Sequence, residues 1–117
     1  MKPSVGVKIL DRNEKENRMH IQVINFNIKI SHKDYEKGAL ELAPIFADLP
    51  GLISKHWLVD KESNTYGGVY IWADKNSFEN YVSGEVFAAV KNNDDFENVT
   101  SKDYGIIAAP TEITRGF

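Results

Sequence analysis

The residues best suited to hold a ligand are aromatic, and they are concentrated on one predicted β-hairpin. Trp57 lies on its first strand, whereas Tyr66, Tyr70 and Trp72 lie on or beside its second strand, so both tryptophans of the chain fall there. Aromatic rings stack on planar organic molecules and commonly line small-molecule pockets. The hairpin therefore predicts a site for a flat organic ligand. Packing of Trp57 and Trp72 in a subunit interface is an equally weighted alternative.

Other kinds of site lack the residues that they need. The chain contains no cysteine, which excludes disulfides, thiolate metal sites and a cysteine nucleophile. Its histidines, His20, His32 and His56, are scattered without metal-ligand spacing. Gly67-Gly68 lies inside a predicted strand instead of before a helix, so it does not resemble a phosphate loop. No serine stands in a nucleophile elbow. We therefore expect no metal and no cofactor.

Length and charge narrow the class of protein further. A chain of 117 residues with 42% hydrophobic residues is expected to fold as one domain. A formal net charge of −3 disfavours nucleic-acid binding, which requires a basic surface. The sequence shows neither a signal peptide nor an apolar segment of about 20 residues that could span a membrane. A cytoplasmic location is the default expectation.

Hydrophobic periodicity gives the order of the elements that must position the aromatic residues. It predicts strands over 21–30, 52–59, 66–73 and 99–109, the last closed by Pro110, with one helix after the first strand and a broken helix after the third. Residues 19–117 form the domain in this interpretation. Residues 4–10 show a weak strand pattern and 11–17 are polar, so residues 1–18 are either an extra edge strand or a mobile arm. Gly67-Gly68 suggests a bulge, or a place where a neighbouring chain or a ligand comes close to the backbone.

Helix boundaries are marked by capping residues. Ser31 and Asp34 form a capping-box-like pair before an apolar stripe that includes Tyr35, Leu42 and Phe46. Pro44 lies inside this stripe and predicts a kink or a split, because proline has no backbone N–H to donate. Asp74 is the expected N-cap of the second helical region, and Gly84 is expected to break that region.

The order β-α-β-β-α-β predicts an α+β fold of the ferredoxin-like type, a four-stranded antiparallel sheet with its helices on one face. We expect the helices to cover the face formed by Ile24, Phe26, Ile28, Val69 and Ile71. The uncovered face would then hold Asn25, Asn27, Trp57, Tyr70 and Trp72. Large exposed aromatic side chains favour burial against a second subunit, so we expect a homodimer. The face occupied by His56 stays open at this stage.

The runs PGLISKHWLVDKESNTYGGVYIWADKNSFENYV and VTSKDYGIIAAPTEITRG resemble the YdhR-type family of small bacterial proteins described as monooxygenases. The residues most specific to this resemblance are Gly51 with Lys55 and Trp57, the block YGGVYIW, and Pro110. The resemblance spans nearly all of residues 19–116 and leaves out 1–18. It implies a dimeric α+β barrel, in which two ferredoxin-like sheets face each other and enclose a cavity in each subunit.

The resemblance also implies an activity, because the family is similar in fold to cofactor-free oxygenases of aromatic polyketides. In those enzymes a deprotonated phenolic substrate passes an electron directly to dioxygen. Such a pocket needs aromatic walls, exclusion of water and a polar group for the phenol proton. The candidates in this chain are Lys55, Tyr70 and Asn25 as catalytic residues, with Asn27, Trp57, Trp72 and Tyr104 as substrate-binding residues.

Two further functions remain open at the level of sequence. One is a non-catalytic dimeric module that holds a small hydrophobic or aromatic molecule. The other is haem binding or degradation, which relatives in the same superfamily carry out. Haem-degrading relatives place a histidine ligand on the helix after the third strand, and residues 74–92 of this chain contain no histidine. The haem function is therefore the weakest of the three hypotheses.

Overall fold

The structure is a computed structural model that describes residues 19–116. The strand or arm expected within residues 1–18 lies outside this range. The described chain runs through β1 (His20–Ile28), α2 (His32–Ala47), β2 (Leu52–Asp60), β3 (Thr65–Trp72), α3 (Lys75–Val82), α4 (Glu85–Lys91), β4 (Phe96–Tyr104) and α5 (Ala108–Ile113). The expected element order is thus confirmed, with a short helix added after the last strand.

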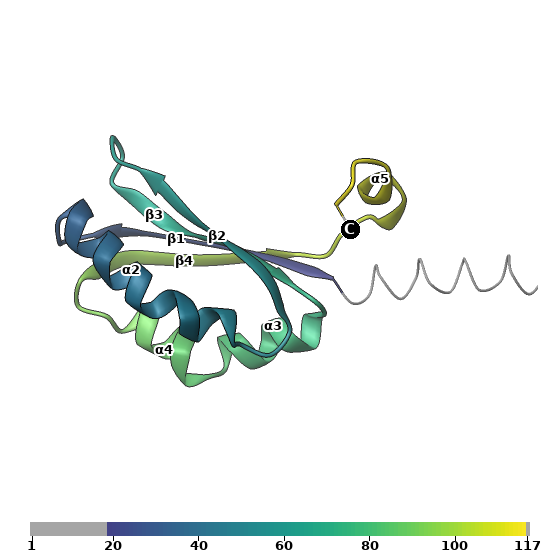
Figure 1. Cartoon of the computed structure of the whole chain (residues 1–117), viewed down its shortest axis with the longest axis horizontal. Coiled ribbons are helices and arrows are strands. Elements are labelled where there is room, and N and C mark those ends of the chain that lie inside the picture. The colour runs from purple at the N-terminus through teal and green to yellow at the C-terminus, as the bar shows by residue number, and fades with distance from the viewer. Residues whose placement is uncertain (1–18, 117) are drawn as a thin grey trace, which may run out of the picture.

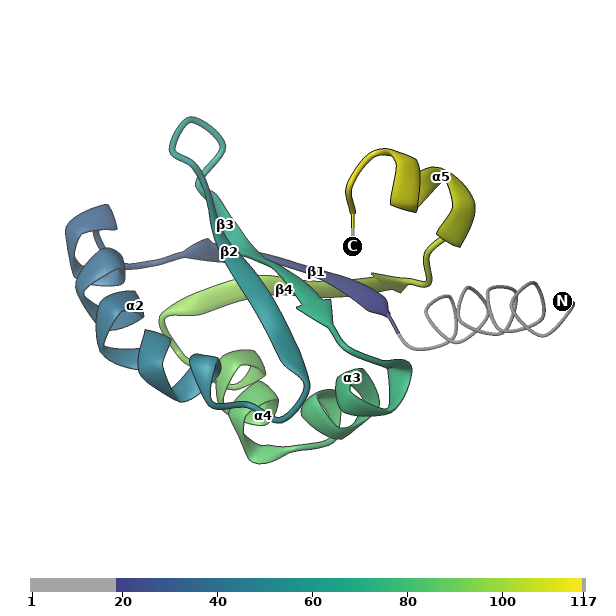
Figure 2. The same ribbon diagram turned by 45° about the vertical axis from the view of Figure 1, so that its right-hand side comes forward.

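The four strands form one antiparallel sheet in the order β2-β3-β1-β4. Helices α2, α3 and α4 lie together on one face of this sheet, whereas α5 stands apart, beyond the end of β4 (Figures 1 and 2). The ferredoxin-like fold is therefore confirmed. Its second sheet face is not covered by a helix of the described chain.

The helices begin where the capping residues place them. The Ser31 hydroxyl accepts a hydrogen bond from the Asp34 amide at 3.1 Å, and the Asp74 carboxylate accepts one from the Ser77 amide at 2.6 Å. These bonds satisfy amides of the first helical turn that have no partner within the helix. Gly84 separates α3 from α4, as expected. The expected split at Pro44 is not found, because α2 continues through this residue to Ala47.

The strand register corrects the assignment of the two sheet faces. In β1 and β3, Gln22 is paired with Tyr70, and His20 is paired with Trp72. Directly paired residues point to the same face of a sheet, so the even-numbered residues of both strands face the helices. Val69 and Ile71 therefore lie on the open face, opposite to the sequence-based expectation. Tyr70 and Trp72 lie on the covered face together with Ile24, Phe26 and Ile28.

The physical reason for this arrangement is the amount of surface that aromatic rings remove from water. Trp72 is fully buried, Tyr70 is 2% exposed, and their rings stack with centroids 5.9 Å apart. The Trp72 indole N–H donates to the Gln22 carbonyl oxygen at 3.0 Å, and the Gln22 amide donates to the Ser101 hydroxyl at 2.9 Å. The polar edge of the buried tryptophan is thereby satisfied inside the core.

The glycine pair in β3 permits two close approaches, both by other segments of the same protomer. Gly67 has a φ of +147°, and a side chain there would collide with the Ile24 carbonyl oxygen of β1. A Cβ on Gly68 would lie 2.8 Å from the Cε atom of Lys55. The alternative of a bulge is wrong, because pairing with β1 runs through both glycines without a shift.

The chain after β4 differs from the expected strand. β4 ends at Tyr104, and Pro110 lies in the first turn of α5 instead of closing a strand. Proline is well tolerated in the first turn of a helix, where its missing N–H would have no helical partner. This segment leaves Ile107 and Ile113 exposed.

Candidate functional site

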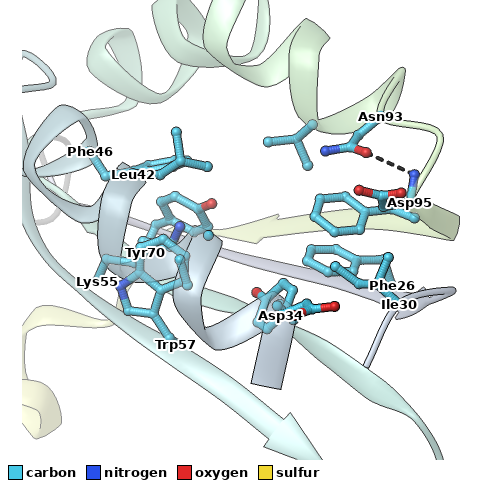
Figure 3. Close-up of a pocket in the computed structure, with 16 residues that line it drawn as sticks. Phe26, Ile30, Asp34, Leu42, Phe46, Lys55, Trp57, Tyr70, Asn93 and Asp95 are labelled. Atoms are coloured by element: carbon cyan, nitrogen blue, oxygen red, sulfur yellow. Dashed lines mark hydrogen bonds between the residues drawn. The ribbon is translucent and has the colours of Figure 1, made fainter. Parts of the chain in front are cut away.

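A cavity of about 180 Å³ lies between the helices and the covered face of the sheet (Figure 3). Its walls come from β1, α2, β2, β3, the end of α4 and the loop before β4. The lining is mainly apolar and aromatic; its members include Phe26, Tyr35, Leu42, Phe46, Trp57, Tyr70, Val90 and Phe96, together with the polar residues Asp34, Lys55, Asn93 and Asp95. Apolar walls with a few polar groups are typical of a small-molecule site.

Lys55 is the cationic residue of this cavity. Its Nζ atom lies 3.4 Å from the centroid of the Phe46 ring, 3.4 Å from that of Trp57 and 4.6 Å from that of Tyr70. Within residues 19–116, no side chain or carbonyl oxygen forms a hydrogen bond or ion pair with this amine. Gly68 leaves the space in which the Lys55 side chain lies against the sheet. The amine is thus held by ring faces alone.

In this environment the neutral and protonated forms of the Lys55 amine are present in similar amounts near pH 7. Burial lowers the pKa of Lys55 to about 7, because the ammonium loses hydration that no carboxylate replaces. The ring faces act in the opposite direction, since their quadrupoles attract the charged form. A lysine in this state can accept a proton from a bound ligand or return it near neutral pH.

The tyrosines near the cavity are held in their neutral form. Burial raises the pKa of Tyr70 far above its ordinary value, with a further contribution from Tyr81, and burial raises the pKa of Tyr35 to about 12. The hydroxyls of Tyr70 and Tyr81 share a hydrogen bond of 3.3 Å. Tyr70 can therefore supply stacking surface, whereas it is poorly suited to serve as a base.

Acidic and amide side chains lie at the other end of the cavity. Figure 3 shows Asp34, Asn93 and Asp95 near Phe26 and Ile30, across the cavity from Lys55 and Trp57. The Asn93 side-chain oxygen accepts a hydrogen bond from the Asp95 amide at 2.8 Å, which orders the loop before β4. Both carboxylates are exposed. A ligand that extends from Lys55 to this end would meet negative charge and hydrogen-bond acceptors there.

The structure divides the seven site residues expected from the sequence into three groups. Lys55, Trp57 and Tyr70 line the cavity. Trp72 lies beneath Tyr70 in the core and does not line it. The remaining residues lie on the open face or its edge, namely Asn25, Asn27 and Tyr104.

The two asparagines have partners in neighbouring segments of the backbone. The Asn27 amide donates to the Asn64 carbonyl oxygen at 2.8 Å, and the Asn25 amide makes a longer contact of 3.5 Å with the Tyr66 carbonyl oxygen. Asn27 also accepts from Asn98 at 2.9 Å, where β4 contains an irregularity. Their positions thus correct the expectation of one aromatic and amide-lined face. His56 also lies on the open face, paired with Val69.

Several lining residues were not selected from the sequence. Tyr35 and Phe46 were recognised only as part of an apolar helical stripe, and Asp34 only as a capping residue. Asp95 was not considered as a site residue at all. A usable signal existed for Tyr35 and Phe46, because a helix stripe that faces the sheet must meet the strand residues below it. The carboxylates gave no such signal.

The described range holds no group of three or more His, Asp or Glu side chains arranged to bind a metal ion. None of its helices has both the length and the apolar character needed to cross a membrane.

The chain is thus a ferredoxin-like domain with a cavity lined mainly by apolar and aromatic side chains. The family model described as "Putative mono-oxygenase ydhR" matches residues 21–117, and the chain belongs to this family. The family resemblance seen in the sequence is therefore confirmed. No curated protein sequence matches the chain.

Solved structures share the fold at low sequence identity. SnoaB, a cofactor-independent oxygenase from Streptomyces nogalater, is 16% identical with a TM-score of 0.62 over 76% of this chain and 93% of that chain. MhuD, a heme-degrader from Mycobacterium tuberculosis, is 16% identical with a TM-score of 0.61 over 75% and 95%. A dabb family protein from Mesorhizobium loti is 16% identical with a TM-score of 0.61 over 76% and 97%. These similarities establish the fold alone.

Proposed function

We propose that this protein is a cofactor-independent monooxygenase that acts on a small planar hydroxyaromatic or quinol-like compound in the cavity above Lys55. The main observation behind this proposal is the environment of the Lys55 amine. It contacts the faces of three aromatic rings and has a pKa near 7. The family to which the chain belongs and the fold of SnoaB support an oxygenase. Catalysis is assigned to Lys55, with Trp57 and Tyr70 as stacking surfaces.

The chemistry requires a base, a shielded pocket and a substrate that can itself act as the reductant. The neutral Lys55 amine takes the proton of a phenolic hydroxyl, and the resulting ammonium stabilises the phenolate. The electron-rich phenolate, in the tautomer that has lost one hydrogen from an activated ring CH₂ carbon, passes an electron to dioxygen. The two radicals join at that carbon as a peroxide, which the Lys55 ammonium protonates. Loss of water leaves a carbonyl at that carbon. One oxygen atom enters the product and the other leaves as water with the two hydrogens of the CH₂ group.

The dimensions and charge of the cavity favour this substrate class over haem. Its volume of about 180 Å³ is below the ~300–1,000 Å³ of typical ligand pockets, so it suits a compound of one or two rings. The carboxylates of Asp34 and Asp95 would repel the propionate groups of haem. A hydroxyl or amino group on the distal end of a ligand would instead donate hydrogen bonds to them.

We further propose that the protein works as a homodimer in the cytoplasm. The open face carries Ile21, Val23, Val69 and Ile71, which are half-exposed in the protomer and adjacent in the register of β1 and β3. A continuous apolar surface of this kind is rarely left in water. Pairing of two open faces would bury it and leave each cavity intact on the other side of its sheet.

Oxygen uptake with a panel of hydroxyaromatic compounds tests the proposed activity. We expect consumption that is insensitive to chelators and that falls ~10²–10⁴-fold in Lys55→Met, because a positioned general base contributes about that factor. Lys61→Met alters an exposed lysine of the β2–β3 turn and should retain full activity. Tight binding without oxygen uptake across the panel would overturn catalysis in favour of a non-catalytic ligand-binding module.

A further inference from the structure

We propose that Lys55 is also a covalent capture site, whose amine forms a reversible imine with small aromatic aldehydes that enter the cavity. The proposal does not depend on oxygenation. In imine formation the Lys55 amine acts as a nucleophile that attacks a carbon atom. In the oxygenase reaction the same amine acts as a base that accepts a proton.

The first observation is that Lys55 differs from every other lysine between residues 19 and 116. The others are all exposed to solvent, whereas Lys55 is half-buried and lies within the cavity. Within the same range its amine is bound to no carboxylate or carbonyl oxygen. The nitrogen is therefore not tied up by a structural hydrogen bond and faces ring surfaces and the ligand space.

The second observation concerns the protonation state. An alkylamine attacks a carbonyl carbon only when it is unprotonated, and desolvation in an apolar pocket is a recognised way to produce such a lysine. Burial lowers the pKa of Lys55 to about 7, so a large share of this amine is neutral near pH 7. An exposed lysine with an ordinary pKa of about 10.4 is almost entirely protonated there.

The step balances without any oxidant, reductant or metal. The lysine nitrogen bonds to the aldehyde carbon, and a proton passes from nitrogen to the carbonyl oxygen to give a carbinolamine. Loss of that oxygen as water forms the C=N bond. The apolar walls from Phe46, Trp57 and Tyr70 stack on the aromatic ring and limit the return of water.

The cavity also sets the class of aldehyde. A volume of about 180 Å³ suits a single substituted ring. Figure 3 shows Asp34 and Asp95 across the cavity from Lys55, so a ring bound with its aldehyde at Lys55 would present its opposite end to them. A hydroxyl group at that end would donate to these carboxylates, whereas a carboxylate would be repelled. We therefore expect 4-hydroxybenzaldehyde to react and 4-carboxybenzaldehyde to react poorly.

Reductive trapping tests the proposal. The full-length protein is incubated near pH 7 with either aldehyde and cyanoborohydride, and the stable secondary amine is located by intact-mass measurement and peptide mapping. We expect one adduct from 4-hydroxybenzaldehyde, at Lys55, formed at least about tenfold faster than at any other lysine because of its lower pKa. The preference should disappear in protein unfolded with urea.

Matched variants separate this site from general lysine reactivity. Lys61→Met should label like the parent protein, whereas Lys55→Met and Lys55→Arg should lose the fast adduct while keeping the far-ultraviolet circular dichroism of the parent. Adducts spread evenly over the exposed lysines of the folded parent protein would overturn the proposal, and this result does not depend on how a variant folds. Selective trapping at Lys55 without oxygen uptake would overturn only the oxygenase proposal. Oxygen uptake without trapping would overturn only the proposed capture site.

Discussion

The two faces of the sheet use their side chains in different ways. The covered face carries the large aromatic residues and the one half-buried lysine of the described chain, and it forms both the core and the cavity. The open face carries β-branched residues such as Val69 and Ile71 with amides and His56 beside them. The aromatic residues of β1, β2 and β3 thus mark the helix-covered side, where a ligand can be enclosed within one protomer.

The largest contrast between the faces should appear in stability. Trp72→Ala removes a fully buried ring and leaves Gln22 without its indole donor, so the free energy of unfolding should fall by ~3–5 kcal/mol. Val69→Ala should cost about 1 kcal/mol in the protomer, because Val69 is half-exposed. Chemical denaturation measures both. Equal losses would show that the two faces do not differ as described.

Association should depend on the open face alone. Val69→Lys places two like charges in the proposed self-complementary interface, and like charges that meet there cost several kcal/mol. We expect the dimer to dissociate at least ~100-fold more readily in analytical ultracentrifugation, with the aldehyde and phenol binding of the cavity preserved. Leu40→Lys is the matched control, since Leu40 is 70% exposed on α2 and should not alter association. A parent protein that is monomeric at micromolar concentration would contradict the proposed dimer.

A smaller effect should follow from disturbing the support of Lys55 on the covered face. A Cβ at position 68 would approach the Lys55 Cε atom to 2.8 Å, so Gly68→Ala must displace this side chain from the ring faces. We expect about a tenfold loss of turnover, since misplacement of a catalytic group by about 1 Å is costly. Gly105→Ala lies outside the cavity lining, meets no atom within 4 Å and should leave turnover unchanged. Unaltered turnover in Gly68→Ala would show that the position of Lys55 is unimportant.

The same buried amine should make stability depend on pH. Because the pKa of Lys55 is about 7 in the folded protein and about 10.5 when unfolded, the unfolded chain binds more protons between these values. The free energy of unfolding should therefore rise as the pH increases from about 7 toward 10. Lys55→Met should flatten that slope, as measured by urea denaturation across the range. An identical slope in the variant would assign the dependence to other groups.

The sequence allowed much of the fold to be predicted, for reasons visible in individual residues. Period-two alternation around Phe26 and capping by Ser31 and Asp74 are local signals, and the structure confirms the elements that they predict. The relation between strands is not local. Whether Tyr70 or Val69 faces the helices depends on pairing with β1, and alternation within β3 is consistent with either choice.

The candidate site was predictable to a lesser degree for the same reason. Lys55, Trp57 and Tyr70 were selected, and the structure brings them together in one cavity. Asn25 and Asn27 were selected on the assumption that the aromatic residues and the amides share a face, and the register separates them. Asp95 reaches the cavity through the loop before β4, and no periodic pattern in the sequence reports the path of a loop.

Both proposed roles of Lys55 depend on the protonation state of its amine inside the cavity. A titration of the protein carrying ¹³C-labelled lysine, followed by NMR at the ε carbon and assigned with Lys55→Arg, measures this property without any substrate. We predict that the Lys55 resonance titrates near pH 7. A Lys55 resonance that titrates near 10.4, the pKa of a lysine in a model peptide, would contradict its roles as proton acceptor and as nucleophile.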